Sequence, residues 1–116
     1  MAMQKFDKKQ LTHLPAVTIR RNGTISLNEL AAEEFRMKDK THVALFFDPA
    51  ENTIGIRPTS SKTDPRAFTI YREKGGTLTI ACQGFLAHCG IPYKQGSKNG
   101  VATWDAKQEM IIVKVP

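Results

Sequence analysis

The chain contains one short β-strand phrase twice, and this repeat limits the fold more than any other feature of the sequence. Residues 23–27, GTISL, return as residues 76–80, GTLTI; both begin with Gly-Thr and then alternate apolar and hydroxyl side chains. The strands before them also match, VTIRR at 17–21 with FTIYR at 68–72, and two extra residues are placed in the second turn. Such a repeat indicates one supersecondary unit present twice.

Later blocks recur in the same order, which extends the repeat over both halves of the chain. The matched blocks are Val43-Ala44 with Val101-Ala102, Asp48 with Asp105, and Ile54-Gly55-Ile56-Arg57 with Ile111-Ile112-Val113-Lys114. We therefore predict a flexible basic N-terminal tail over residues 1–16 and a single domain over 17–116. That domain contains two internal repeats, 17–58 and 67–116, joined by the linker 59–66, whose Ser, Thr, Asp and Pro residues are typical of a linker.

Each repeat has the pattern of two hairpins separated by a short helix. Apolar and polar residues alternate on both sides of Asn22-Gly23, which predicts two half-buried strands around a tight turn whose central residues both need positive φ. Asn28 can cap the following helix of about two turns. Residues 42–58 then predict a hairpin around Asp48-Pro49, with Pro58 ending its second strand.

The second half follows the same plan. Its strands surround Lys74-Gly75-Gly76, a short helix lies near Gln83–Cys89, and the last hairpin turns near Asp105-Ala106-Lys107. One such half would expose too much apolar surface to be stable alone. The predicted fold is therefore mainly β (α+β), with two β-β-α-β-β halves related by a pseudo-twofold axis and sharing one core. We place the aromatic side chains of Phe46, Phe47 and Trp104 in that core.

Composition fits one domain and favours an anionic partner. The chain has 116 residues, of which 41% are hydrophobic, and a formal net charge of +6. A basic balance favours nucleic acid among anionic partners. Apolar runs stay short of the roughly 20 residues that a membrane span needs, and the N-terminus lacks the apolar segment of a secretory signal. We expect a cytoplasmic protein with no membrane association.

Residue types used in catalysis and metal binding do not form a recognisable pattern. Cys82 and Cys89 lie in an apolar stretch and are expected to be buried free thiols. His88 beside Cys89 has no second pair of ligands, and the other histidines, His13 and His42, lie in unrelated settings. Phosphate loops and nucleophile elbows are also missing from the sequence. We expect no metal, no cofactor and no enzymatic activity.

The stretch VTIRRNGTISLNELAAEEFRMKDKTHVALFFDPAENTIGIRP, residues 17–58, resembles the SpoVT/AbrB swapped-hairpin domain family, and residues 68–115 resemble it more loosely. MraZ-type members carry two such units in one chain. The resemblance implies a small swapped-hairpin AbrB-like barrel. It also implies a dimeric DNA-binding regulator that contacts DNA through basic residues of its paired strands and the adjoining helix.

At the positions that face DNA in this family, the chain keeps some of the basic residues and departs from the pattern at others. Arg20 and Arg21 match the basic strand before the turn, and Arg72 and Lys74 keep that character in the second copy. The departures are Thr24 in place of an arginine after the turn glycine, Asn28 in place of the proline that opens the helix, and Ala31 and Ala32 in place of helix arginines.

The leading hypothesis is a DNA-binding protein, an AbrB-like transcriptional regulator that grips phosphates with the basic turns of its two halves. Its predicted nucleic-acid-binding residues are Arg20, Arg21, Arg72 and Lys74, and a basic arm could be added by Lys5, Lys8 and Lys9. The alternative is a protein-interaction or assembly module that uses the edges of its hairpins and the helix with Glu29, Glu33 and Glu34. The sequence leaves open the DNA target, its strandedness and the pairing of two chains as a homodimer.

Overall fold

The computed structural model describes residues 15–60 and 63–115, and only the backbone of Val101. Its elements follow the predicted order of two β-β-α-β-β series. The first series is β1 (Ala16–Ile19), β2 (Thr24–Leu27), α2 (Glu29–Glu34), β3 (His42–Asp48) and β4 (Thr53–Thr59). The second is β5 (Phe68–Arg72), β6 (Leu78–Ala81), α3 (Gln83–His88), β7 (Lys98–Asp105) and β8 (Met110–Lys114).

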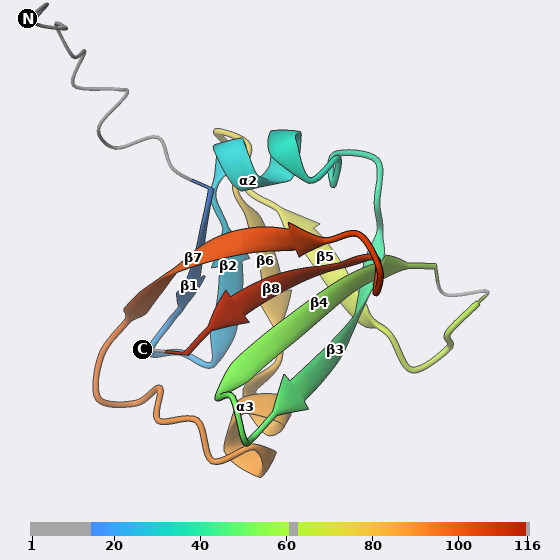
Figure 1. Cartoon of the computed structure of the whole chain (residues 1–116). Coiled ribbons are helices and arrows are strands. Elements are labelled where there is room, and N and C mark those ends of the chain that lie inside the picture. Colours follow the sequence, from blue (N-terminus) through green and yellow to red (C-terminus); the bar gives the residue numbers. More distant parts are fainter. Residues whose placement is uncertain (1–14, 61–62, 116) are drawn as a thin grey trace, which may run out of the picture.

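The strands form a closed antiparallel barrel, which confirms the predicted mainly β class (Figure 1). Around the barrel they follow the order β1-β2-β6-β5-β3-β4-β8-β7, and pairing of β1 with β7 closes the circle. Hairpins from the first and second series therefore alternate around the barrel. Every strand of the described chain has a neighbour on both sides, so the described barrel leaves no free hairpin edge at which a partner strand could pair.

The core fills the inside of the barrel because alternate side chains of each strand point inward. Ile25 of β2 faces Ile80 of β6, and Ile56 of β4 faces Ile111 of β8; all four side chains are fully buried. These two contacts lie on opposite walls of the barrel. A sheet closed on itself gives such residues a common interior without a second layer.

Short helices lie at opposite ends of the strands (Figure 1). Asn28 caps α2 as predicted: its Oδ1 accepts from the backbone N–H of Ala31 at 2.9 Å and from that of Ala16 at 3.1 Å. At the start of α3 the corresponding residue is Cys82, whose side chain makes no capping hydrogen bond. Both helices contribute to the core, α2 through Ala31 and Ala32 and α3 through Leu86.

The hairpin turns of the two series have the same length, so the two extra residues predicted in the second turn are not there. In the first turn, Arg20 N–H donates to Thr24 O at 2.8 Å and Gly23 N–H donates to Arg20 O at 3.0 Å. In the second, Glu73 N–H donates to Thr77 O at 2.8 Å and Gly76 N–H donates to Glu73 O at 3.3 Å. Arg20 therefore corresponds to Glu73.

Asn22 also differs from the expectation that both central turn residues have positive φ. Only Gly23, with φ of 86°, has it in the first turn, as in a three-residue hairpin loop that ends in a left-handed glycine. The Asn22 side chain instead accepts from the Thr24 hydroxyl at 2.7 Å and from the Thr24 N–H at 3.3 Å.

The later hairpins also correspond, with one correction to the alignment. Oδ1 of Asp48 accepts from the N–H groups at 50 and 51, and Oδ1 of Asp105 accepts from those at 107 and 108. Asp48 thus corresponds to Asp105, as predicted. Counting back along both strands pairs Val43 with Gly100, so the predicted match of Val43-Ala44 with Val101-Ala102 is one residue out. Pro58 does not end its strand either, because β4 continues to Thr59.

Two of the three aromatic side chains placed in the core are exposed. Phe46 is 41% exposed because it points outward from β3, opposite Gly55. Trp104 is 43% exposed and stacks on Phe35, the C-cap residue of α2, with ring centroids 6.3 Å apart. Phe47 is half-buried and packs against the core, as expected.

Most of the predicted basic tail lies outside the described residues. Lys5, Lys8, Lys9 and His13 lie in that part, although the last residue of the tail, Ala16, begins β1. Among the described helices, none has the length and apolar character required to cross a membrane.

Candidate nucleic-acid interface

The outer surface of β1, β2, β6 and β5 carries a row of hydroxyl side chains, which we call the hydroxyl face. The strand registers place Thr18 opposite Ser26, Ser26 opposite Thr79, and Thr79 opposite Tyr71. Tyr71 is 58% exposed at one end of the row, whereas Ser26 near its middle is only 5% exposed. At the other end, the Thr18 hydroxyl donates to Oδ1 of Asn99 at 2.7 Å.

The hydroxyl row runs across the strands, and the two hairpin turns lie at opposite ends of the hydroxyl face along the strand direction. Thr24 pairs with Ala81 and Leu27 pairs with Leu78, so the turn before Thr24 and the turn before Leu78 flank the β2–β6 pair at its two ends. Strands rise about 3.3 Å per residue, so these paired strands and the turns separate the two tips by on the order of 20 Å. The face therefore has a turn at each end and hydroxyl groups between them.

The four predicted nucleic-acid-binding residues fall into two classes. Arg21 and Lys74 occupy the same position in the two turns, directly after Arg20 and Glu73, and both are exposed. Arg20 and Arg72 are already engaged. Arg20 forms an ion pair with Glu73, with Nη1 and Oε1 3.4 Å apart. Nη2 of Arg72 donates to the backbone carbonyls of Met37 and Lys40.

Each turn packs against the first residue of the helix from the other series. A Cβ atom at Gly23 would lie 2.7 Å from Cβ of Gln83 in α3, and one at Gly76 would lie 2.8 Å from Cγ of Glu29 in α2. These close approaches place each turn beside a helix and fix its direction. Glycine at these positions is therefore required by contact as well as by positive φ.

Further basic residues, which no local sequence pattern indicates, adjoin the turns. Lys98 pairs with Ile19 across β7 and β1, beside the first turn. Lys40 lies beside the second turn, because its carbonyl accepts from Arg72. Each is far in sequence from the turn that it adjoins, so only the pairing of distant strands and loops could have revealed them.

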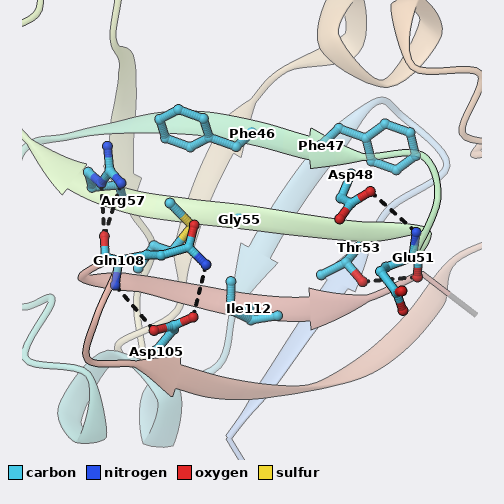
Figure 2. A pocket seen from close by; sticks show the side chains of 11 residues that line it. Phe46, Phe47, Asp48, Glu51, Thr53, Gly55, Arg57, Asp105, Gln108 and Ile112 are labelled. Carbon is cyan, nitrogen blue, oxygen red and sulfur yellow. Dashed lines mark hydrogen bonds between the residues drawn. The ribbon is translucent and has the colours of Figure 1, made fainter.

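The opposite outer surface, over β3, β4, β8 and β7, is chemically different. There the register aligns Phe46 with Gly55 and Gly55 with Ile112, which makes an apolar row, and we call this surface the apolar face. Gly55 lets the Met110 side chain lie across β4. A groove of about 430 Å³ follows this row, with the carboxylates of Asp48, Glu51 and Asp105 among its lining groups (Figure 2).

Arg57 is held in place on the apolar face by its own neighbours. Its Nε and Nη2 donate to the backbone carbonyl of Gln108 at 3.1 and 3.0 Å, and its guanidinium lies 4.8 Å from the centre of the Phe46 ring (Figure 2). The apolar face therefore offers a polyanion little free positive charge at its centre. This contrast makes the hydroxyl face the candidate interface.

The cysteines are free thiols, as predicted. Cys82 is buried, and loss of solvent raises its pKa to about 12, outweighing the smaller opposing effect of a hydrogen bond with the backbone of Ile25. Cys89 is half-buried, and burial raises its pKa too. Both thiols are therefore protonated at neutral pH, which makes them poor nucleophiles. Among the described residues, no three His, Cys, Asp or Glu side chains are grouped so that they could hold a metal ion.

Comparison with known proteins identifies no relative: no protein-family model, curated protein or solved structure matches the chain.

Proposed function

We propose that this protein binds DNA through its hydroxyl face, as an AbrB-like transcriptional regulator built from two swapped-hairpin halves in one chain. The observation that carries the proposal is the placement of Arg21 and Lys74. They are exposed at the same position of two turns with the same hydrogen bonds, one turn at each end of a hydroxyl-lined face. Phosphate groups are neutralised by such basic residues and accept hydrogen bonds from hydroxyl groups.

The pairing of the strands supports the two-half, pseudo-twofold organisation. If β1–β4 are exchanged with β5–β8, every strand pair becomes a pair that is also present in the barrel. Thus β1–β2 becomes β5–β6, β3–β4 becomes β7–β8, and β1–β7 becomes β5–β3. The pairs β2–β6 and β4–β8 become themselves. Interleaving of hairpins from the two halves is also what a swapped-hairpin barrel requires.

The spacing of the two turns favours double-stranded DNA. The major groove of B-DNA is about 12 Å wide, so two basic tips separated by on the order of 20 Å can reach phosphates on both sides of it. The outward-facing hydroxyl groups between the tips would lie over the groove. Single-stranded nucleic acid would instead favour a run of exposed aromatic side chains, and Tyr71 is the exposed aromatic residue of the described part of this face.

A protein-interaction module remains the second candidate function, and the apolar face favours it. Phe46 is 41% exposed beside the 430 Å³ groove. If a protein partner were the principal ligand, substitutions at Phe46 would abolish binding and substitutions in the turns would not. The two functions therefore predict opposite results for the two outer faces of the barrel.

The test is a gel-shift titration with duplex and single-stranded DNA at 50 and 200 mM salt. The wild-type protein is expected to prefer the duplex and to lose affinity at the higher salt concentration. The double variant Arg21→Ala, Lys74→Ala is expected to weaken duplex binding by about tenfold or more at 50 mM salt, since two phosphate contacts are lost.

The matched control is the double variant Lys107→Ala, Lys114→Ala, which removes the same charge from exposed residues on the side of the apolar face. Its affinity for DNA should stay within about threefold of the wild-type value, because these residues lie away from the proposed contact. Absence of duplex binding at 50 mM salt, or equal losses in the two double variants, would contradict the proposal. Arg72 is left unchanged because its hydrogen bonds to Met37 and Lys40 support the fold.

A further inference from the structure

The Glu73 carboxylate lies on the hydroxyl face between the two basic turns. Its Oε1 accepts from the Thr79 hydroxyl at 2.8 Å and is 3.4 Å from Nη1 of Arg20. Thr79 belongs to the middle of the hydroxyl row, where it faces Ser26. A single carboxylate oxygen therefore takes both a guanidinium and a hydroxyl group near the centre of the face.

A phosphate oxygen would use the same partners. Phosphate groups are bound by arginine side chains and accept hydrogen bonds from hydroxyl groups. The carboxylate is held loosely enough to be replaced, because the side chains of Arg20 and Glu73 are 37% and 43% exposed and water competes for both of them. The nearby turns keep Arg21 and Lys74 exposed on either side.

Glu73 is also the residue that corresponds to Arg20 in the second turn. The backbone of each donates to a threonine carbonyl and accepts from a glycine N–H. Identical turns would have placed a basic side chain at both positions. Instead, one side chain is basic and the other is acidic, and the two meet in an ion pair.

We propose that Arg20 and Thr79 form a central phosphate-binding subsite, and that the Glu73 carboxylate occupies it as an internal competitor when no ligand is bound. A phosphate group displaces the carboxylate and takes over the Arg20 guanidinium and the Thr79 hydroxyl. Glu73 thus weakens the binding of every polyanion at this face. For DNA, the inference rests on the proposed function; for free phosphate, it stands alone.

The decisive variant is Glu73→Gln, which keeps the shape of the side chain and removes its charge. Duplex binding at 50 mM salt should become about five- to tenfold tighter, since a repulsive charge and a competitor are removed together. The matched control is Glu33→Gln, which breaks another exposed ion pair, Glu33 Oε1 to Lys38 Nζ at 3.1 Å, with the same change in net charge. It should change affinity by less than about twofold.

The variant Arg20→Ala distinguishes a phosphate subsite at Arg20 from a general effect of net charge on duplex affinity. It should change duplex affinity only slightly in the wild-type background, where the Glu73 carboxylate already pairs with the Arg20 guanidinium. In the Glu73→Gln background it should remove most of the gain in duplex affinity, because the Arg20 guanidinium, no longer paired with Glu73, is then the group that binds phosphate. Equal effects of Arg20→Ala in the two backgrounds would overturn the proposal, as would an unchanged duplex affinity of Glu73→Gln in a protein that binds DNA.

Inorganic phosphate distinguishes the subsite from the proposed DNA function. In an NMR titration of the Glu73→Gln variant, phosphate should shift the Thr79 and Arg20 signals, and addition of Arg20→Ala should abolish the shift at Thr79. If phosphate binds there but duplex DNA does not, the subsite holds and the proposed function fails. If the Thr79 and Arg20 signals do not respond to phosphate, the subsite itself is refuted.

Discussion

The turns at Arg20–Thr24 and Glu73–Thr77 have the same backbone hydrogen bonds but different side-chain chemistry. Each closes a three-residue loop and packs a left-handed glycine against the opposite helix. Yet the first turn begins with arginine and contains asparagine, whereas the second begins with glutamate and contains a second glycine. The barrel requires the backbone pattern because each turn joins two of its paired strands, while the exposed side chains are free to differ.

The difference extends to the contacts behind each turn. Gly23 faces Cβ and Cα of Gln83, atoms that cannot move without the backbone of α3. Gly76 faces Cγ of Glu29, which can rotate away. Likewise, α2 has a side-chain cap and α3 does not. The first turn and α2 therefore contain the stricter local requirements, and the first two of the three predictions below test this.

The largest expected effect on the free energy of unfolding comes from replacing the glycines of the two turns. Gly23→Ala should destabilise the protein by about 2–3 kcal/mol, because a left-handed alanine costs about 1–2 kcal/mol and its Cβ also collides with Gln83. Gly76→Ala should destabilise the protein by about 1–2 kcal/mol, the cost of the left-handed alanine alone, since the Glu29 side chain can move away from the new Cβ. Urea denaturation measures both, with Gly75→Ala as control because its φ is +85° and its surroundings are open. Equal losses at Gly23 and Gly76 would show that the two turns are under the same constraint.

The helix caps should produce a smaller difference. Asn28→Ala should cost about 1–2 kcal/mol, since the N–H of Ala31 loses its capping acceptor. Asn28→Asp keeps the acceptor oxygen and should stay close to the wild-type stability. Amide hydrogen exchange should show faster exchange in α2 of Asn28→Ala and no change in α3. Faster exchange in both helices would instead mean that Asn28 supports the barrel as a whole.

The smallest effect concerns the β7–β8 turn. Hydrogen bonds from the Gln108 side chain and backbone hold the pKa of Asp105 below its ordinary value. A depressed folded-state pKa means that the ionised form stabilises the fold above the ordinary pKa, and that this contribution is lost as pH falls through the folded value. Gln108→Ala should therefore raise the pKa of Asp105 in an NMR titration. The corresponding turn has Glu51 in place of Gln108, so Gln108→Glu should also raise the pKa of Asp105. An unchanged value in both variants would assign the shift to the backbone N–H groups and the charge of Lys107.

Local patterns in the sequence were sufficient to predict the elements. Alternation around Gly23 gave β1 and β2, Asn28 marked the start of α2, and the repeat led to the corresponding elements of the second half. These features depend on neighbouring residues, because strand alternation, turn chemistry and capping act over a few positions. Local patterns did not give the correct counterpart of Val43, which is Gly100 and not Val101, because the alignment of the two halves in this region depends on the register between distant strands.

The candidate site was predictable only in part. Of the four residues that the sequence selected, Arg21 and Lys74 are exposed in the turns. The side chains of Arg20 and Arg72 are engaged by groups more than 30 residues away. The sequence missed Lys98 and Lys40 for the same reason. Phe46 and Trp104 were placed in the core because their size favours burial, although Phe46 points outward and Trp104 stays 43% exposed while it stacks on Phe35.

The sequence by itself determined the repeated strand-turn-strand-helix pattern, the glycines of the turns, the Asn28 cap and the excess of basic residues, since each of these is a local or compositional property. Only the tertiary structure decided which side chains meet. Closure of the barrel through β1–β7 and the pairing of β2 with β6 bring Glu73 to Arg20 and separate a hydroxyl face from an apolar one. Such contacts depend on the register between distant strands, which the whole core sets at once.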